Sequence, residues 1–189
     1  MEVERIYREW DVALRWAPFL LDPSIPPEGR QRKPQTSADT PRNHLELMGE
    51  QRGIEFRRGR TFTPNSHRAL QAAEFAANHG TPEQVLAYHR ALFKANFTDF
   101  EDISRAEVLV RAAADADLDG DALARALDAD EYRARVDEGI AHSYEAGVTG
   151  IPTFIFDDRY AVVGAQEYAT FAQVLVRLGA QRRDGAAGT

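Results

Sequence analysis

Few side chains in this sequence could carry covalent or acid–base chemistry. The 189 residues include no cysteine, so they contain no thiolate nucleophile and can form neither a disulfide nor a cysteine–zinc site. The five histidines do not stand at a metal-ligand spacing such as H-E-x-x-H, and most are expected on solvated helix surfaces. They are His44, His67, His79, His89 and His142. The sequence therefore predicts no catalytic residue and no metal site of its own.

One acidic segment has a spacing that is partly similar to a metal-binding loop. Aspartates alternate with small and apolar residues from Asp115 to Asp121, which is faintly similar to a calcium-binding loop. The closing glutamate of such a loop is missing, because Ala126 stands in its place. We interpret Asp119 as a helix N-cap instead.

The N-terminal part of the chain is expected to supply one helix and one strand. Residues 1–9 have apolar residues at helical spacing. Residues 12–21 are apolar, β-branched and aromatic, which predicts a buried strand that ends or bulges at Pro18. Residues 22–43 are rich in proline, glycine and charge, which is typical of a long loop or flap.

The middle of the chain is predicted to be almost entirely helical. Capping and stop signals predict helices over residues 44–52, 65–79, 81–96, 104–115, 119–127 and 130–146. The strongest start signal is Thr81 with Pro82 at the first helical position and Gln84 three residues after the cap. A second capping box is expected at Ser104 and Glu107.

The pattern near the C-terminus changes to two short apolar runs. Residues 153–156 and 160–163 are predicted to form a β-hairpin around Asp157 and Asp158, followed by a helix over residues 166–178. This order favours an α/β thioredoxin-like fold with an all-helical insertion. The predicted division is a thioredoxin-like domain of residues 1–43 and 147–179, an insertion of residues 44–146 and a disordered tail of residues 180–189.

Four segments of the chain resemble the DsbA-like thiol–disulfide oxidoreductases, in particular the FrnE subgroup. That subgroup is related to 2-hydroxychromene-2-carboxylate isomerases and kappa-class glutathione transferases. The most specific segment is residues 147–154 with 163–166, which resembles the cis-proline loop and the strand-to-helix turn of the family. The other segments are residues 15–21, residues 64–70, and residues 92–97 with 102–103.

The resemblance implies a substrate-docking site that lacks the catalytic cysteines of the family. Family members carry C-x-x-C after a first central strand, and the isomerase and transferase relatives carry serine there; this chain has neither. The resemblance assigns Pro152 as the cis-proline and Ile151 as the residue that offers its backbone to an extended peptide or to glutathione. Thr149 and Gly150 would line the rim. His67 is a further candidate, because the first inserted helix covers the site in this family.

The missing central strand leads to an expectation about the full protein. Without that strand, roughly eight to ten backbone hydrogen-bonding groups on two sheet edges would be unpaired. At about 1 kcal/mol per hydrogen bond, the lost free energy approaches the stability of a whole domain. We therefore expect a truncation or a misplaced start codon, with the natural protein extending upstream of Met1. A cysteine-free paralogue, completed by a partner chain or another segment, is the alternative.

Three functions remain open at this point. The first is a DsbA/FrnE-like oxidoreductase whose 189 residues are redox-inactive alone. The second is a glutathione-dependent isomerase or transferase, and the third is a non-catalytic peptide-binding module. A peptide or thiol substrate is the expected partner, a homodimer is left open, and no cofactor is expected except glutathione in the second case.

The composition argues against several other classes of protein. The net charge of −7, without a basic face, argues against a nucleic-acid partner. No apolar run approaches the roughly 20 residues that span a bilayer, and residues 1–10 are too charged for a secretory signal, so a cytoplasmic location is expected. The excess of arginine over lysine is typical of a GC-rich bacterial genome.

Overall fold

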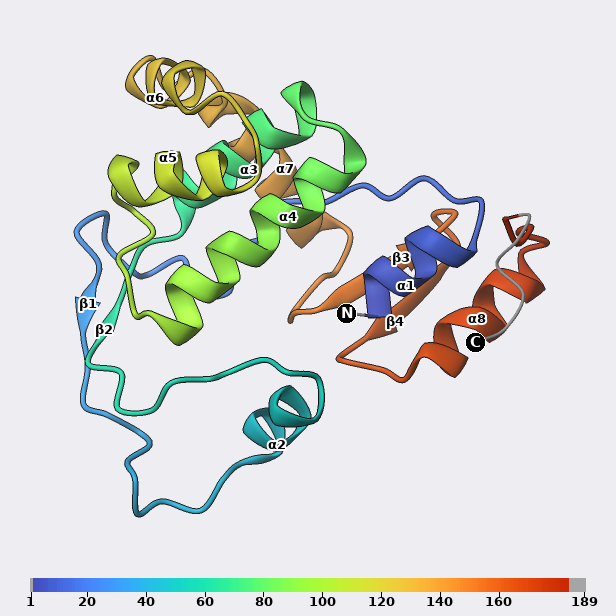
Figure 1. Ribbon diagram of the computed structural model, residues 1–189. Helices are drawn as coiled ribbons and strands as arrows, with labels where there is room; N and C mark the ends of the chain where they lie inside the picture. The colour runs from blue at the N-terminus through green and yellow to red at the C-terminus, as the bar shows by residue number, and fades with distance from the viewer. Residues whose placement is uncertain (1, 184–189) are drawn as a thin grey trace. The chain divides into compact units, whose positions relative to one another are not determined.

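The computed structural model describes residues 2–183, and Figure 1 gives the order of the elements. The chain divides into two compact units. The hairpin unit is Met1–Leu21 with His142–Thr189, as far as these residues are described, and the helical unit is Asp22–Ala141. These boundaries differ from those expected at residues 43 and 147, because the proline-rich residues 22–43 belong to the helical unit.

The hairpin unit contains two helices and one antiparallel strand pair. The helices are α1 (Glu2–Glu9) and α8 (Tyr168–Arg177), and the strands are β3 (Thr153–Phe156) and β4 (Tyr160–Val163) (Figure 1). The register runs from Thr153 opposite Val163 to Phe156 opposite Tyr160, which confirms the predicted hairpin.

The core of the hairpin unit is small. Four buried residues, Ile6, Trp10, Phe171 and Leu175, pack with partly buried hydrophobic residues that include Phe154, Phe156 and Val162. The ring centroids of Phe154 and Phe171 lie 4.6 Å apart. Because successive strand residues point to opposite faces, α1 and α8 cover the face that carries Phe154. The opposite face carries Ile155, which is 51% exposed.

A polar contact also joins α1 to α8. The indole Nε1 of Trp10 donates to the hydroxyl oxygen of Tyr168 at 2.9 Å, and that hydroxyl donates to the carboxylate of Glu9. Arg5 Nε donates to Glu9 Oε1 at 2.7 Å, and the Arg5 guanidinium lies 3.8 Å from the centroid of the Tyr168 ring. The Tyr168 hydroxyl, and then Arg5, lower the pKa of Glu9.

The predicted buried strand over residues 12–21 is wrong. Residues 12–20 take no regular secondary structure, and Leu21 is 64% exposed. No strand among the described residues pairs with this segment, so its backbone forms no inter-strand hydrogen bonds there. Side chains hold it instead: Ser143 Oγ donates to the Pro18 carbonyl at 2.9 Å, and the Tyr144 hydroxyl donates to the Leu20 carbonyl.

The predicted tail is ordered at its start. Asp11 N donates to the Gln181 carbonyl at 2.8 Å, and Arg183 N donates to the Glu9 carbonyl at 3.0 Å. An isolated antiparallel bridge joins Trp10 to Arg182 between them. The remainder of the predicted tail, residues 184–189, lies outside the described residues.

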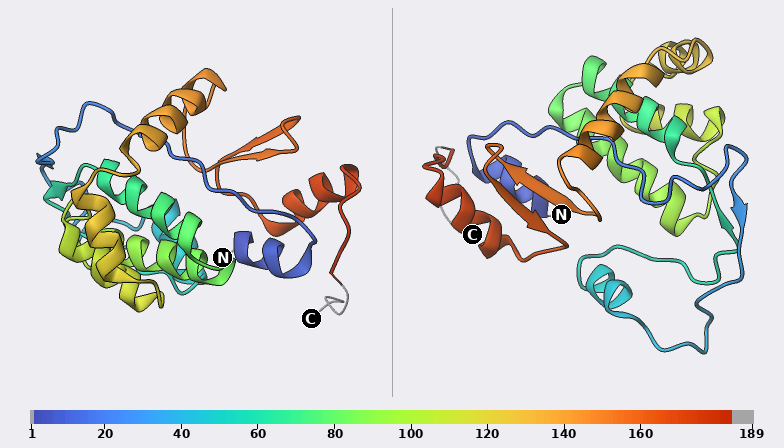
Figure 2. Two further views of the ribbon diagram at one scale, coloured as in Figure 1. Left: turned by 90° about the horizontal axis from the view of Figure 1, so that it is seen from above. Right: turned by 180° about the vertical axis from the view of Figure 1, so that it is seen from behind.

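The helical unit contains most of the helices that the sequence predicts (Figure 2). Its elements are β1 (Arg30–Gln31), α2 (His44–Gln51), β2 (Phe62–Thr63), α3 (His67–His79), α4 (Pro82–Phe93), the π-helix η1 (Lys94–Thr98), α5 (Ala106–Asp115) and α6 (Gly120–Asp128). The last helix, α7 (Arg133–Glu145), begins in this unit and ends in the hairpin unit. Fully buried side chains of α3 to α6 form one core that includes Ala72, Tyr88, Leu109 and Leu123.

Local capping chemistry explains the starts of α4 and α6. The Thr81 box is confirmed: Gln84 N donates to Thr81 Oγ1 at 3.3 Å, and Thr81 N donates to Gln84 Oε1 at 2.9 Å. Asp119 caps α6, accepting from Ala122 N at 2.9 Å. Both satisfy backbone donors that the first turn of a helix leaves free.

Three helix starts differ from the prediction. Ser104 does not cap α5, because its Oγ donates to Asp102 Oδ1 at 2.6 Å and Arg105 takes the cap position. The helix expected from residue 130 begins at Arg133, since Asp130 has a left-handed φ of 49°. α3 begins two residues after Asn65, although Asn65 Oδ1 still accepts from His67 N at 2.9 Å.

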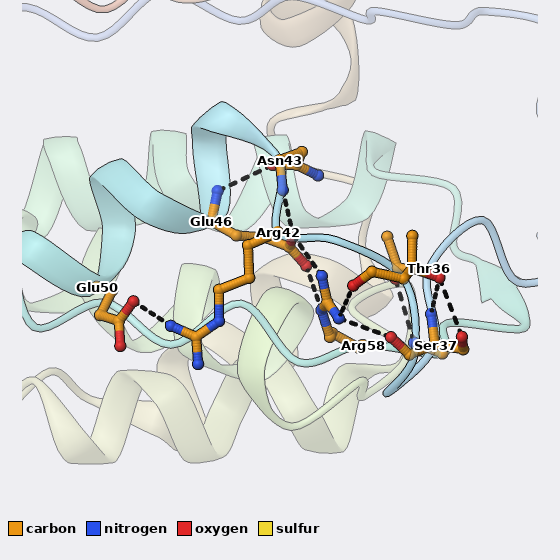
Figure 3. Close-up of polar contacts among 9 residues, drawn as sticks. Thr36, Ser37, Arg42, Asn43, Glu46, Glu50 and Arg58 are labelled. Carbon is orange, nitrogen blue, oxygen red and sulfur yellow. Dashed lines mark hydrogen bonds and ion pairs between the residues drawn. The ribbon is translucent and has the colours of Figure 1, made fainter.

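Arg58 anchors the end of the proline-rich segment within the helical unit (Figure 3). Arg58 donates through Nε and Nη2 to the two carboxylate oxygens of Glu46 at 2.8 and 3.0 Å. Its Nη1 donates to the carbonyls of Ser37 and Thr40, each at 2.6 Å. Hydrogen bonds from Arg58, and then from the backbone of Asn43, lower the pKa of Glu46 to about 2. The predicted flap is therefore anchored at residues 37–46.

The helices of the described residues include none that is both long and apolar enough to cross a membrane. The expected cytoplasmic location stays a prediction.

Candidate substrate-docking site

The predicted docking loop begins where α7 ends. Gly147 has a left-handed φ of 76°, which closes the helix, and its N–H donates to the Tyr144 carbonyl at 3.0 Å. Val148 N donates to the Ser143 carbonyl at 3.1 Å. These bonds to carbonyls of the last turn end the helix immediately before Thr149.

Two hydrogen bonds fix the loop between α7 and β3. Thr153 Oγ1 donates to the Gly150 carbonyl at 2.7 Å, and Gly164 N donates to the Pro152 carbonyl at 2.8 Å. The peptide bond between Ile151 and Pro152 is cis. The loop is thus held by the first residue of β3 and by the residue that follows β4.

Ile151 is an exposed apolar residue of this loop. It is 56% exposed. Among the described residues, neither its N–H nor its carbonyl has a hydrogen-bond partner. Proline at the next position has no N–H to donate, so the backbone donor at this point of the loop is that of Ile151.

The strand that follows the loop has an open edge. Within residues 2–183, β3 pairs with β4 and with no other strand. The N–H and C=O groups on the far edge of β3 therefore have no ladder partner there, which is the condition under which an extended chain can be added. The loop and this edge are continuous in the sequence, from Ile151 into Thr153.

The loop and strand are electrically neutral. Residues 147–156 contain no titratable side chain. The part of the chain that the structure describes holds no group of three or more histidine or acidic residues that could bind a metal ion. The arrangement can offer backbone hydrogen bonds and apolar contact, and it supplies no acid, base or nucleophile.

His67, the fifth predicted site residue, belongs to the helical unit. Its Nε2 lies 2.7 Å from Asp137 Oδ1, and its Nδ1 lies 3.2 Å from Gln71 Nε2. Both ring nitrogens are thus engaged inside that unit. The structure brings Thr149, Gly150, Ile151 and Pro152 into one loop, and a role for His67 at that loop stays a prediction.

Two supports of this region were not predicted from the sequence. Ser143 and Tyr144 hold residues 18–20, but on a helical pattern they are two ordinary polar positions. The Gly164 bond to Pro152 depends on the hairpin register, which brings the end of β4 beside the start of β3.

Comparison with known proteins places these features in a family. The model of the DSBA-like thioredoxin domain matches residues 1–176. The uncharacterized protein YwbO of Bacillus subtilis is 28% identical over 157 residues, which cover 78% of this chain and 74% of that protein.

Two solved structures are similar to the chain. The probable DsbA oxidoreductase SCO1869 from Streptomyces coelicolor superposes with a TM-score of 0.60 and 28% identity over 70% of this chain and 56% of that one. The chain thus spans little more than half the length of that structure. A putative protein disulfide isomerase from Nitrosomonas europaea gives a TM-score of 0.56 over 75% of this chain and 78% of that one; at 18% identity, this likeness shows the fold.

Proposed function

The chain belongs to the DSBA-like thioredoxin domain family, and from this membership we propose that it forms the substrate-docking part of a DsbA/FrnE-type thiol–disulfide oxidoreductase. The docking residues in this proposal are Thr149, Gly150, Ile151 and Pro152. The observation that carries it is the exposed, unbonded backbone of Ile151 beside the open edge of β3.

An extended peptide is the substrate that this geometry suits. Its backbone can exchange hydrogen bonds with Ile151 and continue along β3, as in other cases of strand addition. The Ile151 side chain gives apolar contact to the neighbouring peptide residue. The absence of charge from residues 147–156 means that no particular charge on the peptide is required.

Docking by these residues is separate from redox chemistry. Thiol–disulfide exchange begins when a thiolate attacks one sulfur of a disulfide, and a second thiol then resolves the mixed disulfide. The 189 residues contain no cysteine, so they cannot form that mixed disulfide. We therefore propose that this polypeptide docks peptides and does not reduce or oxidise them.

A turnover assay tests the redox half of the proposal. The 189-residue chain is added to insulin with dithiothreitol, and the rate of precipitation is compared with the rate without protein. The expected result is the background rate. A protein-dependent acceleration would overturn the redox half.

A binding assay tests the docking half with a matched pair of variants. Ile151→Ala is compared with Val176→Ala, which shortens an apolar side chain that is 66% exposed on α8 of the same unit. The affinity for an extended, cysteine-containing peptide should fall about fivefold in the first variant, about 1 kcal/mol, and stay unchanged in the second. Equal affinities would contradict the docking role. A parallel titration with glutathione distinguishes the isomerase or transferase alternative, since tighter binding of glutathione than of the peptide favours it.

A further inference from the structure

A basic cluster lies in the helical unit, outside the candidate docking loop of residues 149–152. It consists of Arg32, Arg57 and Arg60. Arg32 N donates to the Thr61 carbonyl at 2.8 Å, which extends the β1–β2 ladder by one residue and brings Arg32 next to Arg60. Arg57 N donates to the Phe97 carbonyl at 3.0 Å, which fixes the same segment to the end of η1.

Two of these guanidiniums face one aromatic ring. The Cζ atoms of Arg57 and Arg60 each lie 5.2 Å from the centroid of the Phe100 ring. Arg60 also lies 5.6 Å from the Phe97 centroid, and its Nη2 donates to the backbone and side-chain oxygens of Asn96. Asn96 engages one nitrogen of the Arg60 guanidinium, and no hydrogen bond among residues 2–183 uses its Nε or Nη1.

Within residues 2–183, no carboxylate forms an ion pair with the cluster. None of the ion pairs formed by the described residues includes Arg32, Arg57 or Arg60. Arg58, in the same segment, is by contrast fully engaged with Glu46. Partial burial, and then the positive charge of Arg32, lower the pKa of Arg60.

The carboxylates of Asp99 and Glu101, which follow η1, pair with other cations. Asp99 Oδ2 accepts from Lys94 Nζ at 2.6 Å, and Glu101 pairs with Arg111. Arg57 reaches only the backbone carbonyl of Asp99, at 3.5 Å. Arg60 thus lies near the charge of Arg32 and shares the Phe100 ring with Arg57, on a chain whose overall charge is −7.

The backbone around the cluster is also unusual. η1 is a π-helix, and Phe100 has a left-handed φ of 58°. Such departures are found more often than average at ligand-binding positions. Here they place Asn96, Phe97 and Phe100 against Arg57 and Arg60.

We propose that Arg32, Arg57 and Arg60 bind a small phosphate-bearing anion. A phosphate group has several oxygens that can accept from different guanidiniums at once, and arginine is the side chain best suited to it. Chloride offers a single charge without that geometry. The site lies in the helical unit and does not depend on the docking function of the hairpin unit.

Calorimetric titration of the full 189-residue chain tests the proposal. Inorganic phosphate and pyrophosphate are titrated at an ionic strength kept constant with sodium chloride, and we expect saturable binding with a Kd of about 1 mM or tighter. Arg32→Gln and Arg60→Gln should each weaken binding about tenfold. Arg125→Gln removes the same charge from an exposed position on α6 and should leave Kd unchanged.

The variants separate loss of the site from loss of the fold. Arg32→Gln decides the matter if Arg60→Gln fails to fold, because the Arg32 side chain has no hydrogen bond or ion pair among the described residues. A nucleoside monophosphate in a parallel titration distinguishes free phosphate from phosphate on an organic group. Absence of saturable phosphate binding, or equal affinity in the parent chain and Arg32→Gln, would overturn the proposal.

Discussion

The helical unit and the hairpin unit are stabilised in different ways. In the helical unit each helix satisfies its own backbone, and the buried faces of α3 to α6 meet in one continuous core. In the hairpin unit two short strands satisfy each other along one edge, and the buried core consists of Ile6, Trp10, Phe171 and Leu175. The comparison shows why a helical segment can be complete in itself while a strand depends on a neighbour that is distant in the sequence.

The largest expected effect comes from the helical core. Leu109 is 0% exposed, so Leu109→Ala should lower the free energy of unfolding by about 3 kcal/mol through lost burial and a cavity. The control Leu47→Ala removes the same atoms from a residue that is 45% exposed and should cost much less. Hydrogen exchange measured by mass spectrometry should show lost protection in α3 to α6 and unchanged protection in β3 and β4. Equal losses in both units would mean that they unfold as one body.

A titration within the helical core should give an effect of similar size. Burial lowers the pKa of His89 to about 4, from 6.5 in an exposed histidine. The neutral form is thus favoured in the folded state, so this contribution is complete above pH 6.5 and is lost as the pH falls towards 4. This shift in pKa corresponds to a change of roughly 3 kcal/mol in the free energy of unfolding.

Chemical denaturation between pH 7 and pH 4 measures this dependence. His89→Leu should flatten the part of the pH profile below 6.5, and His44→Gln, at an exposed position, should not. A profile for His89→Leu that matches the parent chain would contradict the assignment.

Helix caps should give a smaller effect. Thr81 accepts a hydrogen bond from Gln84 N, whereas Ser66 stands at the cap position of α3 without any side-chain capping bond. Thr81→Ala should therefore destabilise the helical unit by about 1 kcal/mol, and Ser66→Ala by much less. Urea denaturation of the two variants measures the difference, and equal midpoints would argue against the capping box.

Most of the helices and the β3–β4 hairpin could be predicted from the sequence. Thr81 with Gln84, and Asp119, act on backbone groups within three residues, so their signals are local. The strand expected at residues 12–21 was wrong for the opposite reason. Its apolar pattern is that of a buried strand. A strand forms only where another strand pairs with it, and the local pattern does not show whether such a strand is present.

The candidate site was predictable in part. The loop at Thr149 to Pro152 is contiguous in the sequence and followed from the resemblance of residues 147–154. The arginine cluster did not, since the β1–β2 pairing brings Arg32 close to Arg60, and Arg57 and Arg60 lie near Phe100, which follows the π-helix. Neither the β1–β2 pairing nor the π-helix has a strong local signal in the sequence.

The central claim is that the backbone of Ile151 and the open edge of β3 receive an extended peptide. Residue-resolved NMR of the 189-residue chain during titration with such a peptide tests it most directly. We expect the amide signals of Thr149, Ile151 and Thr153 to shift in a saturable manner while those of α4 in the helical unit stay in place. Saturable binding that leaves these three amides unmoved would contradict the account.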